Sequence, residues 1–358
     1  MPIERIDRTD KVPSFSIRYK GVETAMKPVS VELKIDNKVM PQTAIETFIF
    51  DQLLGEHNIL ALELRRTKEL EDQFGKTIEN NIKAWITKTI NLRITAADKS
   101  ANDSGVVDFI GIVVTATMGS EVGSLGNIYL RCLSPTILLD SNKLYCTWLD
   151  MASQDIINGL ISAEGLPNVK VSATGTKLNG FISYGQTAFR IIQYLAGFEG
   201  WWVYYDGTNF NVVKDLPESS IELKANQVSA FVLMVDLISK KALRGREFEY
   251  LSGNWFQGQS NPQNTPSHTA SKAVYNASKH LSTSEFLRLR YSPASQGDFD
   301  QRINTALNQN YSRLMRGNGL TDRLGITIGK ILKFDGKNIA KQTESRREEE
   351  LTGQYIIT

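Results

Sequence analysis

Alternation of apolar and polar residues at every second position constrains the fold of this chain more than any other feature. Val31, Leu33 and Ile35 alternate with charged residues, and Asp36-Asn37 follows as a turn signal. The pattern returns in residues 60–64, 86–94, 109–117 and 127–133. Period-two spacing places one face of a strand on a core. Several such strands within the first 135 residues predict a β-sandwich or a β-barrel.

The spacing of apolar residues changes to three and four after Pro135. This helical spacing predicts a first helix through Leu149, Ala152, Ile156 and Leu160. A second helix is predicted after Ser183, with Gly197 at its end. Residues 201–205 and 210–213 flank Asp206-Gly207 and predict a hairpin. Residues 140–215 therefore form a small mixed α/β insert between β-rich segments.

The C-terminal part returns to strands after this insert. Strand texture covers residues 220–223 and 228–238, and the polar stretch 252–283 predicts a long surface loop. A third helix is expected over residues 298–316, ended by Gly317 and Gly319. Residues 325–334 and 351–358 read as further strands, joined by a charged loop.

Charge and hydropathy exclude several classes of protein. The 358 residues include 41 Lys and Arg against 39 Asp and Glu, a net charge of +2, so there is no electrostatic case for nucleic acid as a partner. The longest apolar run is far shorter than the roughly 20 residues of a membrane span, so no integral membrane segment is predicted. The N-terminus has no apolar stretch typical of a signal peptide, so we expect synthesis in the cytoplasm.

No constellation of catalytic residues is visible, so the chain is not predicted to be an enzyme. The three histidines, His57, His268 and His280, have no metal-ligand spacing. Cys132 and Cys146 are interpreted as free buried thiols, because Cys132 falls on the apolar face of a strand. We therefore assign no catalytic residue, no cofactor and no metal ligand.

Three segments could be mistaken for sites. The aromatic run Trp201, Trp202, Tyr204 and Tyr205 suggests either a carbohydrate platform or the core of a covered hairpin, and the core is favoured. Residues 119–126 are glycine-rich but precede no helix, so they read as a hairpin loop. The charged run 344–350 reads as a solvated loop. A cell-wall hydrolase and a carbohydrate-binding module remain the alternative functions.

Three blocks, taken in order, resemble a known family. They are Asp108 to Gly165, Tyr184 to Gly207, and Ser312 to Thr358. Together they resemble the base of the valine-glycine repeat protein of type VI secretion (VgrG) and the hub of contractile phage tails. The motif residues that carry the resemblance, all expected to be structural, are Gly111, Pro135, Trp148, Gly200, Trp202, Gly329 and Gly353.

The resemblance implies a mainly β (α+β) fold with two antiparallel β-barrels and an intervening α/β domain. The first barrel would comprise residues 1–135 and be completed by about 220–250, and the insert would comprise residues 136–219. A polar loop would cover residues 252–283. Residues 284–358 would form a helix plus a second barrel truncated at its C-terminus. It implies a homotrimeric baseplate hub whose partners are a hexameric tube protein, a spike domain or spike protein, and baseplate wedge proteins. Such a hub would be released as part of an injection particle.

Overall fold

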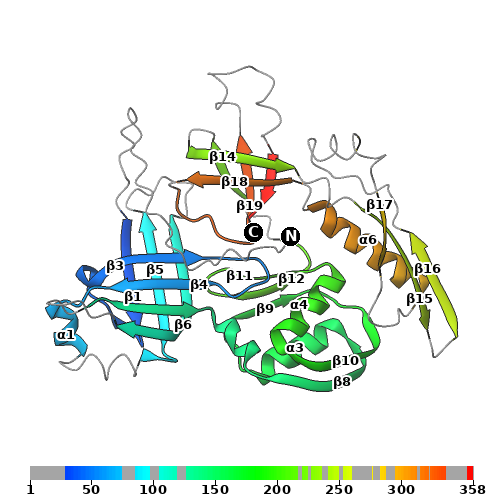
Figure 1. Cartoon of the computed structure of the whole chain (residues 1–358), viewed down its shortest axis with the longest axis horizontal. Helices are drawn as coiled ribbons and strands as arrows, with labels where there is room; N and C mark the ends of the chain where they lie inside the picture. Colours follow the sequence, from blue (N-terminus) through cyan, green and yellow to red (C-terminus); the bar gives the residue numbers. More distant parts are fainter. Residues whose placement is uncertain are drawn as a thin grey trace, which may run out of the picture.

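The computed structural model describes residues 29–74, 85–96, 105–118, 126–216, 220–224, 227–235, 241–249, 253–259, 276, 283–287, 295–312, 315–321, 323–335 and 353–357. Strands dominate, and Figure 1 shows a curled N-terminal sheet, a helix-containing part beside it, and several smaller C-terminal sheets. The mainly β fold with an intervening α/β part is confirmed.

Seven antiparallel strands form the N-terminal sheet, in the order β2-β1-β5-β6-β7-β4-β3. They are β1 (Val29–Ile35), β2 (Lys38–Val39), β3 (Ile45–Asp51), β4 (Ile59–Leu64), β5 (Thr89–Ala96), β6 (Val106–Met118) and β7 (Ile128–Leu133). The alternating residues do what the pattern predicts, since Leu33, Leu60 and Leu92 are buried on the inner face. The short 3-10 helix η1 (Gln42–Ala44) and helix α1 (Lys68–Phe74) connect strands of this sheet.

Strand β6 is long because it serves two partners. Its first half pairs with β5 and its second half with β7, and its register with β7 shifts between Val113 and Thr115. Gly111 lies where these halves meet. A Cβ there would lie 2.5 Å from the Phe109 ring and 2.9 Å from the Leu133 carbonyl oxygen, so only glycine fits.

The α/β insert begins at the 3-10 helix η2 (Pro135–Asp140), whose first turn contains Pro135. Its elements are β8 (Lys143–Ala152), α3 (Ser153–Ala163), β9 (Val169–Ser172), β10 (Lys177–Thr187), α4 (Ala188–Glu199), β11 (Trp202–Tyr205) and β12 (Phe210–Val213). Strands β8 and β10 form one sheet, and β11, β12 and β9 form another.

Two helix boundaries in the insert differ from the prediction. Leu149 and Ala152 belong to strand β8, and the helix starts only at Ser153. Helix α4 continues past Gly197 and ends at Gly200, whose φ of 77° is the left-handed conformation that favours glycine.

The C-terminal part contains helix α6 (Gln296–Ser312) and three small sheets. Their strands are β13 (Ser220–Lys224), β14 (Val228–Val235), β15 (Lys241–Glu249), β16 (Asn254–Gln259), β17 (Thr283–Leu287), β18 (Met315–Thr321), β19 (Ile331–Asp335) and β20 (Gly353–Ile356). Strand β16 lies within the predicted polar loop. The predicted third helix ends at Ser312 rather than Arg316, because residues 315–321 pair with β14.

The strands described between residues 220 and 249 do not complete the first sheet as expected. Strand β13 pairs with β19 and β14 pairs with β18, so both join C-terminal strands. Strand β15 pairs with β16 and β17 in the sheet that α6 covers, where Leu243 packs with Phe299 and Ile303.

One hydrophobic core unites the N-terminal sheet with the α/β insert. It contains Leu60 and Phe109 from the sheet together with Ile156, Ile192 and Phe210 from the insert. The change in the spacing of apolar residues at Pro135 therefore marks a change of secondary structure inside a continuous core.

Candidate functional site

The turn between β11 and β12 lies against strand β6 and joins the insert to the N-terminal sheet. The Gly207 carbonyl oxygen accepts a hydrogen bond of 2.7 Å from the Ile110 backbone N–H. The Tyr205 hydroxyl donates to the Ile110 carbonyl at 3.0 Å, and the Asn58 side-chain amide donates to the Tyr205 carbonyl at 2.7 Å. The bonds from Gly207 and Tyr205 satisfy both backbone groups of Ile110 in the first half of β6, on the side that β7 leaves unpaired.

Asp206 holds this turn in shape. Its Oδ1 accepts hydrogen bonds from the backbone N–H groups of Thr208 and Asn209, at 2.9 and 2.7 Å. Burial by itself raises the pKa of Asp206, but these backbone bonds and those from the Thr208 and Asn211 side chains outweigh it and lower the pKa. The charged carboxylate is thus the form that the folded turn stabilises.

Asp206→Asn is expected to lower the free energy of unfolding by about 1–2 kcal/mol at pH 7, because the amide is a weaker acceptor than the carboxylate. The folded-state pKa of Asp206 is lowered, so its contribution is fully present above the unfolded value of about 4 and is lost as the pH falls through the folded value. Urea unfolding of both proteins across this range should show the difference shrinking in acid. A constant difference would contradict this account.

A C-terminal segment packs on the same hairpin. Gly329 has a φ of 82°, and a Cβ there would lie 2.4 Å from the Tyr204 ring. Ile328 is buried with Tyr204 and Val213, and Trp202 packs against this cluster. Trp201, Tyr204 and Tyr205 are buried and Trp202 is half-buried, so the aromatic run is hairpin core as predicted. The exposed platform of Trp201, Trp202 and Tyr204 that a carbohydrate-binding module would need is not formed, because Trp201 and Tyr204 are buried.

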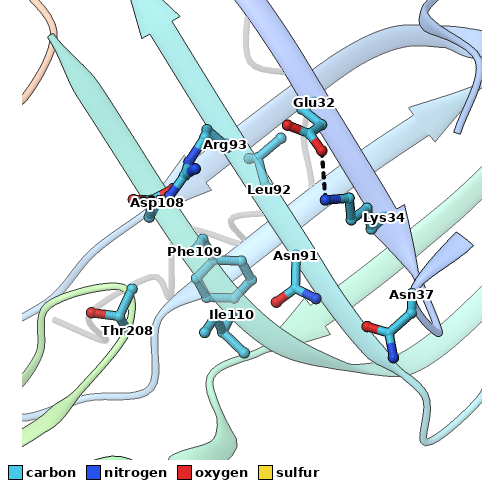
Figure 2. A pocket seen from close by; sticks show the side chains of 10 residues that line it. All are labelled: Glu32, Lys34, Asn37, Asn91, Leu92, Arg93, Asp108, Phe109, Ile110 and Thr208. Carbon is cyan, nitrogen blue, oxygen red and sulfur yellow. Dashed lines mark hydrogen bonds and ion pairs between the residues drawn. The ribbon is translucent and has the colours of Figure 1, made fainter. Parts of the chain in front are cut away.

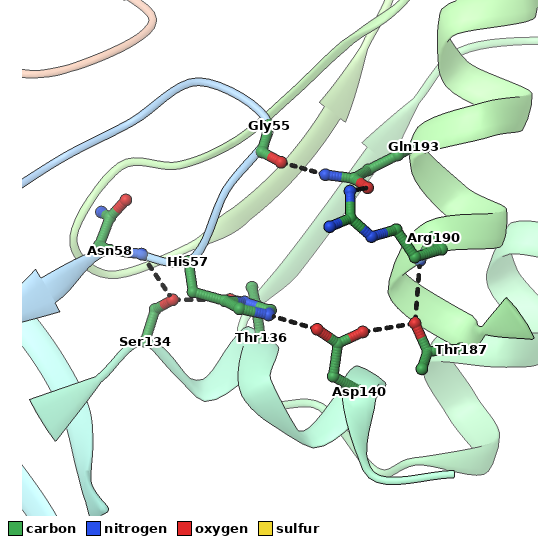
Figure 3. A network of polar contacts seen from close by, with 9 residues as sticks. All are labelled: Gly55, His57, Asn58, Ser134, Thr136, Asp140, Thr187, Arg190 and Gln193. Carbon is green, nitrogen blue, oxygen red and sulfur yellow. Dashed lines mark hydrogen bonds and ion pairs between the residues drawn. The ribbon is translucent and has the colours of Figure 1, made fainter. Parts of the chain in front are cut away.

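A polar network centred on His57 joins the β3–β4 loop to the insert (Figure 3). The imidazole Nδ1 lies 2.7 Å from Thr136 Oγ1 and its Nε2 lies 2.8 Å from Asp140 Oδ2. Asp140 also accepts a hydrogen bond from the Thr187 hydroxyl, at the N-terminus of α4. The His57 ring lies on Phe189, with the centroids 4.3 Å apart.

This arrangement of hydroxyl, imidazole and carboxylate has the order of a hydrolase triad, but its surroundings fit a structural role. Thr136 and Ser134 are fully buried, and their hydroxyl oxygens lie 2.6 Å from each other. A nucleophile needs access to its substrate, which these hydroxyls lack. No local pattern predicted the network, because His57 and Asp140 are separated by more than eighty positions and belong to different elements.

An open hollow lies on the outer face of the N-terminal sheet (Figure 2). Its charged side chains are paired with each other: Arg93 contacts Asp108 at 2.7 Å and Lys34 contacts Glu32 at 2.6 Å. Thr208 of the β11–β12 turn lines one side. Because opposite charges neutralise each other there, the hollow has no electrostatic preference for an anionic or a cationic ligand.

The two predicted buried cysteines differ in exposure: Cys132 is buried as predicted, whereas Cys146 is only partly buried, so the prediction is wrong for Cys146. Burial raises the pKa of the Cys132 thiol to about 12, which agrees with the predicted unreactive cysteine. Within these residues no group of three or more His, Cys, Asp or Glu side chains could hold a metal ion, and no helix is both long and apolar enough to cross a membrane. His268, His280, most of the glycine-rich loop and the charged run 344–350 lie outside the described residues.

The predicted motif residues lie mainly at contacts between elements. Gly111 packs against Phe109 and Leu133, and Trp202 and Gly329 pack around Tyr204. Pro135 begins η2. Trp148 stacks near Phe181, at 5.6 Å between centroids, and a Cβ at Gly200 would lie 2.6 Å from Thr305 of α6. Gly353 begins β20 opposite Phe334. Their shared role as family motif residues stays a prediction.

Several of the described sheets present apolar side chains to solvent, among them the β14–β18 and β8–β10 sheets. On β14 and β18, Val232, Met234 and Leu320 are each more than half exposed. On β8 and β10, Tyr145 and Tyr184 are exposed in the same way. Such surfaces mark sites of contact with other molecules.

Comparison with known proteins identifies the fold. No protein-family model matches the chain, and no curated protein matches it in sequence. A 43 kDa tail protein of prophage MuSo2 from Shewanella oneidensis matches with a TM-score of 0.59 and 11% identity, covering 92% of each chain. A tail protein from Neisseria meningitidis matches with a TM-score of 0.58 and 11% identity, covering 86% of each chain.

The chain has the fold of these tail proteins. A component of the type VI secretion system from Escherichia coli also matches, with a TM-score of 0.47 and 10% identity over 85% of this chain and 67% of that one. The two tail proteins confirm the sequence resemblance to phage tail proteins at the level of the fold.

Proposed function

We propose that this chain is a structural protein of a contractile tail or tail-like injection particle, a trimeric adaptor that joins a hexameric inner tube to a trimeric spike. The tail-protein fold over nearly the whole chain is the observation that carries the proposal. The described residues support it further, since the hydroxyl side chains of the triad-like arrangement around His57 are buried, where a substrate could not reach them. No residue is assigned a catalytic role.

Symmetry supplies the physical logic of such an adaptor. Closed threefold assembly with two similar β modules in each chain presents six similar surfaces, which match a hexameric ring on one side while the trimer matches a threefold spike on the other. Contacts of this kind depend on shape and need no reactive group. The adaptor would be made in the cytoplasm, assembled there with tube, spike and wedge proteins, and released within the particle.

The exposed face of β14 and β18 is the surface we assign to contact between copies. Val232 and Met234 on β14 lie opposite Asn318 and Arg316 of β18, and Leu320 continues the same surface. Three apolar side chains more than half exposed on a two-stranded sheet leave apolar area that a neighbouring subunit would bury.

Light scattering of the purified protein tests this assignment. We expect a mass three times that of the 40.1 kDa chain, and dissociation toward monomers when Met234→Asp introduces a charge into the contact. Val39→Asp is the control, because Val39 is also half-exposed but lies on β2. A wild-type protein that remains monomeric at its highest soluble concentration would contradict the trimeric adaptor.

A further inference from the structure

The outer face of the β8–β10 sheet carries a contiguous apolar patch that the adaptor role does not explain. Tyr145, Leu149, Ile182 and Tyr184 are 76, 67, 49 and 78% exposed. Tyr145 lies directly opposite Tyr184, and Leu149 lies opposite Gly180. Ile182 is paired with Thr147, between these two pairs. The four apolar side chains therefore share one face, which we call the β8–β10 face.

The backbone holds the β8–β10 face in a fixed shape. Gly185 has a φ of 78°, at the point where the register of β10 shifts, and a Cβ there would lie 2.7 Å from the Tyr145 hydroxyl oxygen. Glycine thus leaves room for the Tyr145 ring across the bulge. On the opposite face, Phe181 packs between Trp148 and Tyr194 of α4. A surface ordered before binding loses less conformational entropy when a partner docks.

The size of this face indicates one docked element rather than a second copy of the chain. With total areas of about 150–250 Å² for a tyrosine side chain, the two exposed rings offer roughly 300 Å², and the two aliphatic residues add less. A stable subunit interface needs about 800 Å² from each partner. The β8–β10 face falls short of this, although a patch of several hundred Å² is large for a monomer surface.

The position of the β8–β10 face also favours a docked element of another protein over a second copy of this chain. This step rests on the proposed function. Figure 1 shows β8 and β10 at the lower end of the molecule and β14 and β18 at its upper end. Helices α3 and α4 lie on the inner side of β8 and β10, so the exposed tyrosines point away from the molecule. If copies meet through β14 and β18, the β8–β10 face remains open to a different protein.

We propose that the β8–β10 face binds an amphipathic α-helix of another tail component. Two strands about 4.8 Å apart make a face roughly 10 Å wide, which matches the 10–12 Å diameter of one helix. Charge lies only at the ends of the face, at Lys143 and at the Lys177–Asp150 pair 3.6 Å apart. The helix therefore presents an uncharged stripe of aliphatic side chains at helical spacing. Leu149 and Ile182 favour such a stripe over a sugar ring.

A binding assay on the purified chain tests the face without requiring a particle. The probe is a fluorescent helical peptide of about five turns, with leucines along one side and alanine, lysine and glutamate elsewhere. Fluorescence anisotropy should show binding that weakens about tenfold or more in Leu149→Asp and in Tyr145→Ala. A peptide with glutamine in place of leucine should not bind.

Ile49→Asp is the matched control, because Ile49 is 53% exposed on β3 of the N-terminal sheet. It should bind the peptide as the wild type does, and all variants should keep the wild-type melting temperature. Absence of binding to the wild-type chain, or an equal loss in Ile49→Asp, would overturn the proposal. Retention of the chain on purified cell-wall glycan that is lost in Tyr145→Ala would overturn it in favour of a carbohydrate ligand.

The identity of the helix is tested by photocrosslinking from position 182 in assembled particles. Ile182 replaced by benzoylphenylalanine should crosslink to one apolar-striped helical segment of a different polypeptide, whereas the same group at the exposed Lys170 should not. Crosslinks to another copy of this chain would refute the proposal. Failure of the adaptor role would instead appear in the mass measurement, while the peptide assay would still report on the face.

Discussion

Gly207→Ala is expected to lower the free energy of unfolding by more than about 3 kcal/mol, because two penalties act together. Gly207 has a φ of 108°, which residues with a Cβ rarely adopt. The added methyl group would also lie 2.1 Å from the Asp108 carbonyl oxygen. The turn would have to withdraw from β6, and the bond from Ile110 N–H to the Gly207 carbonyl would be lost.

Gly165→Ala separates these two penalties. Gly165 has a φ of 62° at the end of α3, but nothing lies within 4 Å of its added Cβ. Gly165→Ala should lower the free energy of unfolding by only about 1 kcal/mol, the ordinary cost of the left-handed conformation for a residue with a Cβ. Chemical denaturation of the two variants and the wild type gives the comparison. Equal destabilisation of the two variants would show that the close contact between the Gly207 turn and β6 contributes no penalty beyond the backbone conformation.

Strand periodicity predicted the N-terminal sheet well because one face of each strand is buried and the other faces solvent. Leu60, Leu62 and Leu64 are buried while Ala61 is exposed, so the alternation in the sequence is the alternation in the structure. The helix face of α4 was equally legible, since Ile191, Ile192 and Leu195 are fully buried. In these elements the spacing of apolar residues along the local sequence matches the residues that are buried.

The boundaries that were predicted wrongly depend on tertiary pairing. Leu149 fits helical spacing with Ile156, but it is placed in a strand by its pairing with β10. Residues 254–259, which were predicted to belong to a polar loop, form β16 because β15 pairs with them and Phe256 packs against the core under α6. Local pattern has no information about partners that lie far away in the sequence.

The contacts of the β11–β12 turn and of His57 could not be predicted for the same reason. Asp206-Gly207 was recognised as a turn, but nothing in the local sequence indicated that β6 receives it. His57 gave no signal of its contact with Asp140. The exposed tyrosines of β8 and β10 could have been found, since aromatic residues on the polar phase of an alternating strand are a mark of a binding surface.

Asp298→Ala is expected to lower the free energy of unfolding by about 3 kcal/mol, because it leaves the buried guanidinium of Arg302 without its nearest carboxylate. Arg302 Nε lies 2.7 Å from Asp298 Oδ1, and the two side chains are only 5 and 9% exposed. The guanidinium also lies 3.3 Å from the Phe198 ring centroid, at the contact between α6 and α4. The pair therefore helps to hold the C-terminal part against the insert.

The double variant Asp298→Ala with Arg302→Met tests whether the cost comes from leaving the buried Arg302 charge without Asp298. Burial lowers the pKa of Arg302 to about 9, so the side chain is still charged at pH 7. Methionine fills similar space against Phe198 without a charge, and the double variant should be more stable than Asp298→Ala alone. For Asp298→Ala the unfolded chain binds more protons than the folded one above pH 9, so its deficit relative to the double variant should narrow there. A double variant no more stable than the single one would mean that the carboxylate stabilises α6 by itself, through its place in the first turn of the helix.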